Sequence, residues 1–425
     1  LEADGRTGDF LIAKAAYSLR SLGTRQATLA AAGDTVARAD GKFVVRVRRS
    51  SDDALKSFTA DEITDGTLVD FVSVSVGTAV NGTGSYNHYT LTNASNTGFS
   101  ADNGDGGASM AGFPYSFTNG DEITVQFTVS NFNNTGGNPQ LIGTESTSNG
   151  TSKSDFQFIT ANGTYTKTLT ATADGTHLMF RHFGVGSYTI SDFQVTSSTV
   201  TRDGFVQTWY DQSVTNEAGD TATGNHAVQA TAAEQPKIVN AGALLNELDF
   251  DGTDDTLGID FGADLSQANS LFMVHQSDST SSNSNDFFDR ISGSPRTLLD
   301  QSGSNYRMLS ASSVSTGVAV TTDKSLVFAL YNGASSLFAK NGTATSVLNA
   351  GTDGINQNSS LGSSGSNFYN GTMQEFIVYN SDQTDNRGAI EANIGEAYSI
   401  TGIPAYDNEV DGFVETWYDQ SGNSN

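Results

Sequence analysis

The feature that most constrains the fold is an Asn-Gly dipeptide that recurs between short runs of alternating apolar and polar residues. Asn and Gly both accept positive φ angles, so this pair favours the tight turn that joins two antiparallel strands. Runs rich in Val, Phe, Tyr and Thr flank these turns along most of the chain. The pattern predicts an all-β protein built from antiparallel β-sandwiches. The turns lie at Asn81-Gly82, Asn119-Gly120, Asn149-Gly150, Asn162-Gly163, Asn332-Gly333, Asn341-Gly342 and Asn370-Gly371.

The charge balance narrows the class of partner. The 425 residues include 21 Lys and Arg against 47 Asp and Glu, which is a net charge of −26. An acidic surface repels phosphate backbones and anionic lipids, so we expect no nucleic-acid partner and no membrane insertion. No apolar run approaches the roughly 20 residues of a membrane-spanning helix. This composition suits an extracellular protein or a virion surface, and the absence of cysteine leaves the redox compartment open.

Two short helices are expected in this β-rich chain. Residues 9–23 carry apolar side chains at helical spacing, and Gly23 can end the helix. Residues 382–398 show the same spacing near the end of the strand-rich region. A short capped turn is expected at 58–71, with Thr59 or Asp61 as the candidate cap. The chain begins with Leu rather than Met, so we expect that an upstream piece once preceded it.

An eleven-residue motif occurs twice, at 203–213 and at 411–421. Each copy contains one of the two tryptophans of the chain, Trp209 and Trp417. The first copy reads as a strand that runs into a hydrogen-bonded corner. The second copy predicts that residues 403–425 start a further repeat or add a strand to a neighbouring molecule. The expected assembly residues are Phe413, Trp417 and Tyr418.

Several motifs of the chain lie in an order that resembles the catalytic domain of fungal-type α-L-arabinofuranosidase B. They occupy residues 16–20, 45–52, 208–213, 224–226, 361–362, 368–371 and 391–394. The same arrangement resembles laminin-G-like modules of marine phage virion proteins and bacterial surface proteins. The resemblance implies a concanavalin A-like sandwich over residues 1–71 and 202–402.

The region between these two segments has a different character. Charged residues become sparse from about residue 72 to residue 200, and short strands alternate with Gly-rich turns. Residues 123–130, 162–165 and 191–195 resemble a carbohydrate-binding-module-type jelly roll. The two resemblances together imply that residues 72–201 are a smaller sandwich inserted in the larger one, which is a tolerated arrangement at an exposed loop.

The arabinofuranosidase resemblance also implies two catalytic carboxylates, and the matching positions lack them. The nucleophile position falls near Ser294 and the acid position falls on Ser366. Asp286 and Asp289 are the nearest carboxylates to the first position, and the family's adjacent cysteine pair is absent. A retaining glycosidase needs two carboxyl groups about 5–5.5 Å apart. We therefore expect that the fold is kept and that the chain is not an enzyme.

Two kinds of ligand site remain as candidates. Sugars stack on exposed aromatic rings, and the candidates in or beside jelly-roll loops are Tyr86, Tyr89, Tyr115 and Phe132; the alternative is that these rings belong to the core. No cofactor is expected except a structural Ca²⁺, because oxygen-rich turns can hold this ion. Its candidate ligands are Asp249, Asp251, Asp254 and Asp255, with a second group at Asp102, Asn103 and Asp105. An ordinary solvated hairpin explains both groups as well.

These observations predict a non-catalytic structural or adhesive protein. We expect a virion appendage, or a subunit of an extracellular filament or surface layer, that binds other copies of itself and a surface glycan. Two alternatives stay open: an arabinofuranosidase-like glycoside hydrolase, and a monomeric glycan-binding module.

Overall fold

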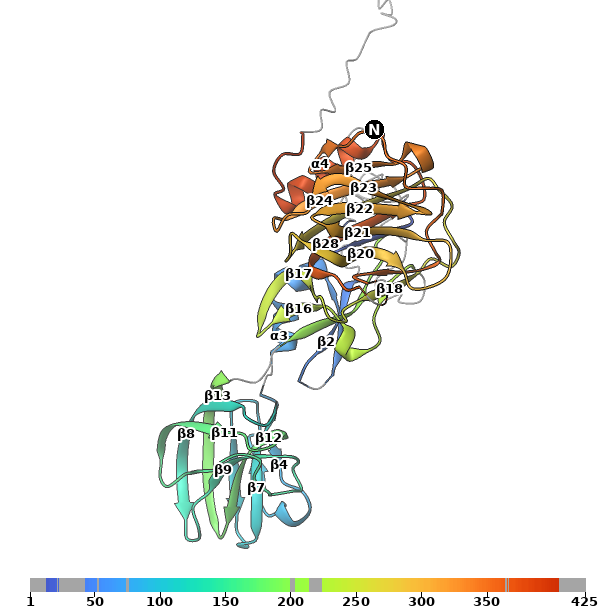
Figure 1. The fold of residues 1–425 in the computed structure, drawn as a ribbon. Coiled ribbons are helices and arrows are strands. Elements are labelled where there is room, and N and C mark those ends of the chain that lie inside the picture. Colours follow the sequence, from blue (N-terminus) through green and yellow to red (C-terminus); the bar gives the residue numbers. More distant parts are fainter. Residues whose placement is uncertain are drawn as a thin grey trace, which may run out of the picture. The chain divides into compact units, whose positions relative to one another are not determined.

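The computed structural model of the chain describes residues 13–20, 22, 43–51, 53–73, 76–198, 203–213, 224–363, 365 and 367–404. Among them, two compact units are distinct: a first unit with residues up to 44, 208–235 and 247 onwards, and a second unit with residues 45–207 and 236–246. Antiparallel strands dominate both units (Figure 1). The predicted all-β sandwich architecture is confirmed.

Strand pairing in the first unit follows two series, which face each other as the layers of a sandwich. The Phe288 and Phe376 rings, one from each series, lie 5.2 Å apart. The hydroxyl group of Tyr331 donates a hydrogen bond of 2.6 Å to the carbonyl oxygen of Leu298 across the same gap. The first series comprises β1 (Ala15–Ser18), β17 (Ala243–Asp251), β28 (Asn370–Tyr379), β19 (Asn269–Ser277), β24 (Ser325–Tyr331), β25 (Leu337–Lys340) and β26 (Thr343–Ala344). The second comprises the end of β14 (Gly204–Trp209), whose first four residues belong to the second unit, β15 (Ala227–Val228), β18 (Leu257–Asp260), β27 (Asn358–Leu361), β20 (Ser282–Arg290), β21 (Thr297–Gly303), β22 (Asn305–Ser310) and β23 (Ser312–Ala319).

Helix α4 (Arg387–Tyr398) packs on the outer face of the first series. Its Ile390 and Ile394 share a buried cluster with Phe272, Phe328 and Ile377. Strands β19, β24 and β28 are therefore covered on both faces, which explains why they read as continuous apolar runs. The predicted helix at 382–398 is confirmed over the range of α4.

The predicted helix at 9–23 is wrong where the structure describes it, because β1 occupies its centre. Ala15 pairs with Val378 and Ser18 pairs with Glu375 in antiparallel register. All residues of β1 are buried, and the ring of Tyr17 lies 5.8 Å from that of Trp209. Apolar side chains at 3.6-residue spacing can also line a fully buried strand, and the ladder with β28 decides between the two.

The motif at 203–213 forms the corner that its sequence predicts. Trp209 is fully buried, and Asp211 follows it as a hydrogen-bond acceptor. Asp211 Oδ1 accepts hydrogen bonds from the backbone N–H groups of Ser213 and Ala16, both at 2.9 Å, and Oδ2 accepts one from Asn225 at 3.1 Å. One carboxylate thus fixes the turn and ties it to β1. The second copy of the motif, with Phe413, Trp417 and Tyr418, lies outside the described residues.

The second unit contains two five-stranded antiparallel sheets around one aromatic-rich core. We call these two sheets, which lie within residues 80–198, the jelly roll. One sheet has the order β10 (Gln157–Phe158), β9 (Gln140–Thr144), β12 (Gly175–Phe183), β7 (Ala108–Phe117) and β4 (Val80–Asn81). The other has the order β11 (Gly163–Thr170), β8 (Glu122–Asn134), β13 (Gly186–Ser198), β6 (Phe99–Asn103) and β5 (Thr90–Thr92). The same unit also includes most of β2 (Phe43–Arg49), β3 (Leu55–Thr59), α2 (Ala60–Thr64), α3 (Thr67–Val72) and β16 (Lys237–Asn240).

The capped turn expected at 58–71 is confirmed. Thr59 caps α2 by accepting a hydrogen bond from the Glu62 backbone, and the Glu62 side chain accepts one from the Thr59 backbone. The second unit is wider than the predicted insertion at 72–201, whose boundaries stay a prediction. In the described part of the chain, no helix has the length and apolar character needed to span a membrane.

Candidate active site

A pocket of 420 Å³ opens in the first unit. This volume lies within the range of about 300–1,000 Å³ that is typical of small-ligand sites. Residues of the neighbouring strands β15, β18 and β27 and of the adjoining loops line the pocket. They are Val228, Gln229, Glu234, Asp254, Thr256, Gly258, Ile291, Ser360, Ser363, Gly365 and Phe368.

The floor of the pocket follows from strand pairing. Val228 of β15 pairs with Gly258 of β18, which pairs with Ser360 of β27. A Cβ atom at position 258 would lie 3.5 Å from Ile291 Cδ1 and 3.6 Å from the carbonyl oxygen of Val228. Both residues line the pocket, so any longer side chain at position 258 would project into it. The glycine therefore makes the hollow.

Glu234 supplies the first carboxylate of the pocket. It ends the short 3-10 helix η3 (Ala232–Glu234), and the backbone N–H of Thr256 donates a hydrogen bond of 3.1 Å to its carbonyl oxygen. The Gln229 amide donates a hydrogen bond of 3.0 Å to Glu234 Oε2. The Gln229 oxygen in turn accepts one from the backbone N–H of Thr231 at 2.9 Å. The Gln229 side chain, which the Thr231 backbone orients, thereby holds the Glu234 carboxylate at the pocket wall.

Asp254 supplies the second carboxylate. It lies in the turn between β17 and β18, where its backbone N–H donates a hydrogen bond of 3.3 Å to Asp251 Oδ1. Carboxylate oxygens of Asp251, Asp254 and Asp255 all lie within 4.8 Å of one another. Burial raises the pKa of Asp255 to about 7, and the charges of Asp251 and Asp254 act in the same direction. The turn therefore holds a proton near neutral pH beside the pocket.

Apolar and hydroxyl groups complete the pocket. Val228 and Ile291 are 43% and 53% exposed, and Phe368 is half-buried. Thr256, Ser360 and Ser363 contribute hydroxyl groups. An apolar wall beside hydroxyl and carboxylate groups matches the mixed C–H and O–H surface of a sugar.

The arabinofuranosidase resemblance places its catalytic residues in the loops of Ser294 and Ser366, and both loops contribute to the pocket. Ile291, three residues before Ser294, and Gly365, one residue before Ser366, line it. The carboxylates of the pocket, Glu234 and Asp254, lie in other segments of the chain. Ser294 is exposed, and Ser366 lies outside the described residues. Motif matching missed Glu234 entirely. It misses such a residue because the chain brings position 234 to the pocket only through the pairing of β15 with β18.

Asp289, the nearest carboxylate in the sequence comparison, has a structural role. It is 1% exposed, and Arg296 Nε and Nη2 donate hydrogen bonds of 2.6–3.1 Å to both of its oxygens. Such a bidentate pair fills the acceptor sites of the carboxylate. Asp286 is fully buried and does not line the pocket.

Two of the four aromatic residues expected to bind glycan are core residues. Tyr89 and Tyr115 are 5% and 3% exposed and belong to the jelly-roll core, so neither ring offers a face to a sugar. Tyr86 and Phe132 are half-buried, and each packs against a buried cluster.

The expected calcium ligands come together only in part. Asp251, Asp254 and Asp255 form the group described above, and Asp249 is not part of it. In the second group, Asn103 is buried and its amide donates hydrogen bonds to the carbonyl oxygens of Gly107 and Gly184. A structural Ca²⁺ stays a prediction.

No family model and no curated protein matches the sequence, whereas several solved structures resemble the fold. A GH54 α-L-arabinofuranosidase soaked with a cyclic sulfate inhibitor has 13% identity and a TM-score of 0.32, covering 66% of this chain and 62% of that one. Trypanosoma rangeli sialidase in complex with the inhibitor DANA has 13% identity and a TM-score of 0.32, covering 45% and 31%. Domain 4 of a GH43 extracellular arabinanase from Geobacillus stearothermophilus, in complex with arabinotriose, has 14% identity and a TM-score of 0.24, covering 31% and 74%. The match thus spans about a third of the sialidase.

These neighbours are glycoside hydrolases or a domain of one. They correct the expectation of a non-catalytic structural or adhesive protein, together with the expectation that the chain is not an enzyme. At identities of 13–14% and TM-scores of 0.24–0.32, the chemistry of this chain rests on the residues of its own pocket.

Proposed function

We propose that the protein is a glycoside hydrolase whose reaction takes place in the pocket at Gly258. The observation that carries this proposal is the presence of two carboxylates, Glu234 and Asp254, in one hollow of suitable size. Cleavage of a glycosidic bond needs two carboxyl groups. One protonates the leaving oxygen, and the other attacks the anomeric carbon or activates a water molecule.

The two carboxylates differ in their surroundings, which separates their roles. Two further carboxyl groups lie within 4.8 Å of Asp254, and burial raises the pKa of one of them, Asp255, to about 7. A proton is therefore available beside Asp254, which lines the pocket and takes the role of proton donor. Glu234, held by the Gln229 amide, takes the role of nucleophile or base.

The motif resemblance supplies the first substrate to test, an α-L-arabinofuranoside. The apolar wall formed by Val228, Ile291 and Phe368 would contact the C–H face of the sugar. The hydroxyl groups of Ser360 and Ser363 would contact its O–H groups. Polysaccharides that carry such arabinofuranosides lie outside the cell, so the proposal includes an extracellular location.

The test is the hydrolysis of 4-nitrophenyl α-L-arabinofuranoside and of arabinan by the full chain. We expect Glu234→Gln and Asp254→Asn each to lower kcat by about 100-fold or more, because general acid–base groups contribute about 10²–10⁴-fold. Asp254→Asn should lose less activity on the nitrophenyl substrate than on arabinan, since nitrophenolate leaves without protonation. Exposed Glu396→Gln and Asp385→Asn are the matched controls and should keep full activity.

A third variant tests the pocket without touching a carboxylate. Gly258→Val suits a paired strand and fills the hollow, so activity should be lost while the melting temperature is retained. An enzyme that tolerates Gly258→Val, or wild-type protein without activity on a panel of glycosides, would contradict the proposal.

A further inference from the structure

A second hollow, of 250 Å³, lies on one sheet of the jelly roll, in the second unit. Its polar groups come from three neighbouring strands in two rows. In one row, Asp102 of β6 lies between Thr90 of β5 and Ser187 of β13. In the next row, Ser100 lies between Thr92 and Thr189. These side chains point to the outer face, because the residues between them are buried.

A β-bulge brings an amide group to the edge of this hollow. The register of β13 with β8 shifts between the pairs Ser187 with Asn133 and Thr189 with Ser130. Asn131, in the extra stretch of β8, has a φ of 52°, and its Nδ2 donates a hydrogen bond of 3.3 Å to Thr189 Oγ1. Bulges of this kind redirect a side chain. Here the bulge turns an amide toward a row of hydroxyl groups.

The chemistry of the hollow selects one class of ligand. Asp102 is exposed, and its carboxylate can accept hydrogen bonds from two adjacent hydroxyl groups of a sugar. The Asn131 amide can both donate hydrogen bonds to a sugar and accept them from it. No Lys, Arg or His is among the residues that line it, so nothing there attracts an anion. The threonine methyl groups provide apolar contact. The volume is below the roughly 300–1,000 Å³ of an enclosing site, so the hollow suits a segment of a longer chain.

We propose that this hollow, defined by Ser100, Asp102, Asn131 and Thr189, binds a neutral polysaccharide separately from the pocket at Gly258. None of these four residues is aromatic, so the site does not depend on ring stacking. The site anchors the protein to a glycan by hydrogen bonds from a sheet face. It does not depend on hydrolysis in the first unit.

The experiment is native affinity electrophoresis of the full chain carrying Glu234→Gln, which prevents cleavage of the probe. The gels contain arabinan, arabinoxylan, galactomannan or mixed-linkage glucan, and alginate serves as the anionic polymer. We expect at least one neutral polymer to retard the protein. Asp102→Ala and Asn131→Gly should each weaken that binding by about ten-fold or more, because each removes hydrogen bonds to the ligand.

The variants are chosen so that folding is preserved. Asp102 is exposed, and glycine accepts the φ angle of position 131. Thr168→Ala is the matched control, because Thr168 lies on the same sheet face and its hydroxyl group pairs with Thr124 at 2.9 Å, away from the hollow. It should bind within about two-fold of the parent, and all variants should melt at the same temperature.

The proposal is overturned if no neutral polymer retards the protein, if alginate alone does so, or if Asp102→Ala and Asn131→Gly both bind as the parent does. If the wild-type protein hydrolyses no glycoside but a neutral polymer still retards it, the binding proposal holds and the enzyme proposal fails. If the protein hydrolyses a glycoside but no polymer retards it, the enzyme proposal holds and the binding proposal fails.

Discussion

Glu391 shows at the scale of one residue how burial links stability to pH. It lies in α4 and is 2% exposed, with Arg387 Nε at 3.7 Å from its Oε2. Burial raises the pKa of Glu391 to about 7, and the charge of Arg387 opposes this shift only in part. The folded protein therefore binds a proton here that the unfolded chain releases above pH 4.5.

A folded-state pKa above the unfolded value makes stability fall as pH rises from about 4.5 to about 7. Glu391→Gln keeps the shape and removes the ionisation, so its free energy of unfolding should exceed that of the wild type by about 2 kcal/mol at pH 8. The difference should vanish near pH 4. Urea denaturation at both pH values measures it, and exposed Glu396→Gln in the same helix is the control. An equal gain at both pH values would show that packing, not ionisation, is responsible.

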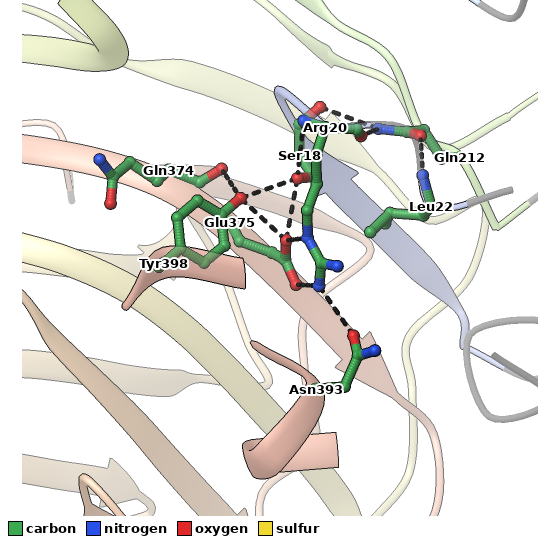
Figure 2. A network of polar contacts seen from close by, with 8 residues as sticks. All are labelled: Ser18, Arg20, Leu22, Gln212, Gln374, Glu375, Asn393 and Tyr398. Carbon is green, nitrogen blue, oxygen red and sulfur yellow. Dashed lines mark hydrogen bonds and ion pairs between the residues drawn. The ribbon is translucent and has the colours of Figure 1, made fainter. Parts of the chain in front are cut away.

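At the scale of elements, a buried polar network anchors β1 to β28 and α4 (Figure 2). Glu375 of β28 is 1% exposed and accepts hydrogen bonds from Arg20 Nε at 2.7 Å and Arg20 Nη2 at 2.9 Å. The hydroxyl groups of Ser18 and Tyr398 each donate to Glu375 Oε2 at 2.9 Å. One carboxylate thereby joins three elements.

The corner motif reaches the same strand end from the other side. The Gln212 amide donates to the carbonyl oxygen of Ser18 at 2.8 Å and accepts from the backbone N–H of Leu22 at 3.0 Å (Figure 2). The Gln212 side chain thus satisfies the carbonyl oxygen of Ser18 and the backbone N–H of Leu22, which a buried strand end would leave unpaired.

Removing the charge of Glu375 should therefore weaken the docking of β1. We expect Glu375→Gln to lower the free energy of unfolding by about 2–3 kcal/mol, because it removes a buried charge that pairs with Arg20 through two hydrogen bonds. The control is Asp53→Asn, which breaks the exposed pair with Arg48 and should change stability by less than about 0.5 kcal/mol. Chemical denaturation gives both values, and equal effects would argue against an anchoring role.

At the scale of the whole molecule, the jelly roll carries its own core. All strands of its two sheets pair within residues 80–198. Its buried cluster runs from Ala79 to Phe193. A segment with complete sheets and a complete core is expected to fold independently.

We therefore predict that a protein of residues 76–198 folds alone and unfolds in one cooperative transition, followed by circular dichroism during heating. A matched variant with Phe113→Ala should melt at a clearly lower temperature, because Phe113 is fully buried in that core. A segment that shows no cooperative melting would argue that 45–71 and 236–246, which belong to the same unit, are required.

The short-range sequence pattern determined the fold class, helix α4, the capped turn at 58–71 and the corner at Asp211. Each of these depends on residues that are close in sequence, such as turn dipeptides, caps and helical spacing. The same logic could not decide the state of residues 15–18. Their strand pairs with β28, and the Ser18 to Glu375 bond spans 357 positions.

Only the tertiary structure decided which groups face solvent and which share a site. Tyr89 and Asp102 both lie in polar stretches of the jelly roll, but the sheets bury the first and expose the second. Glu234 and Asp254 belong to no common motif, and they line one pocket because β15, β18 and β27 pair side by side around Gly258. The reason is that strand pairing joins distant segments, so burial and proximity are properties of the assembled sheets.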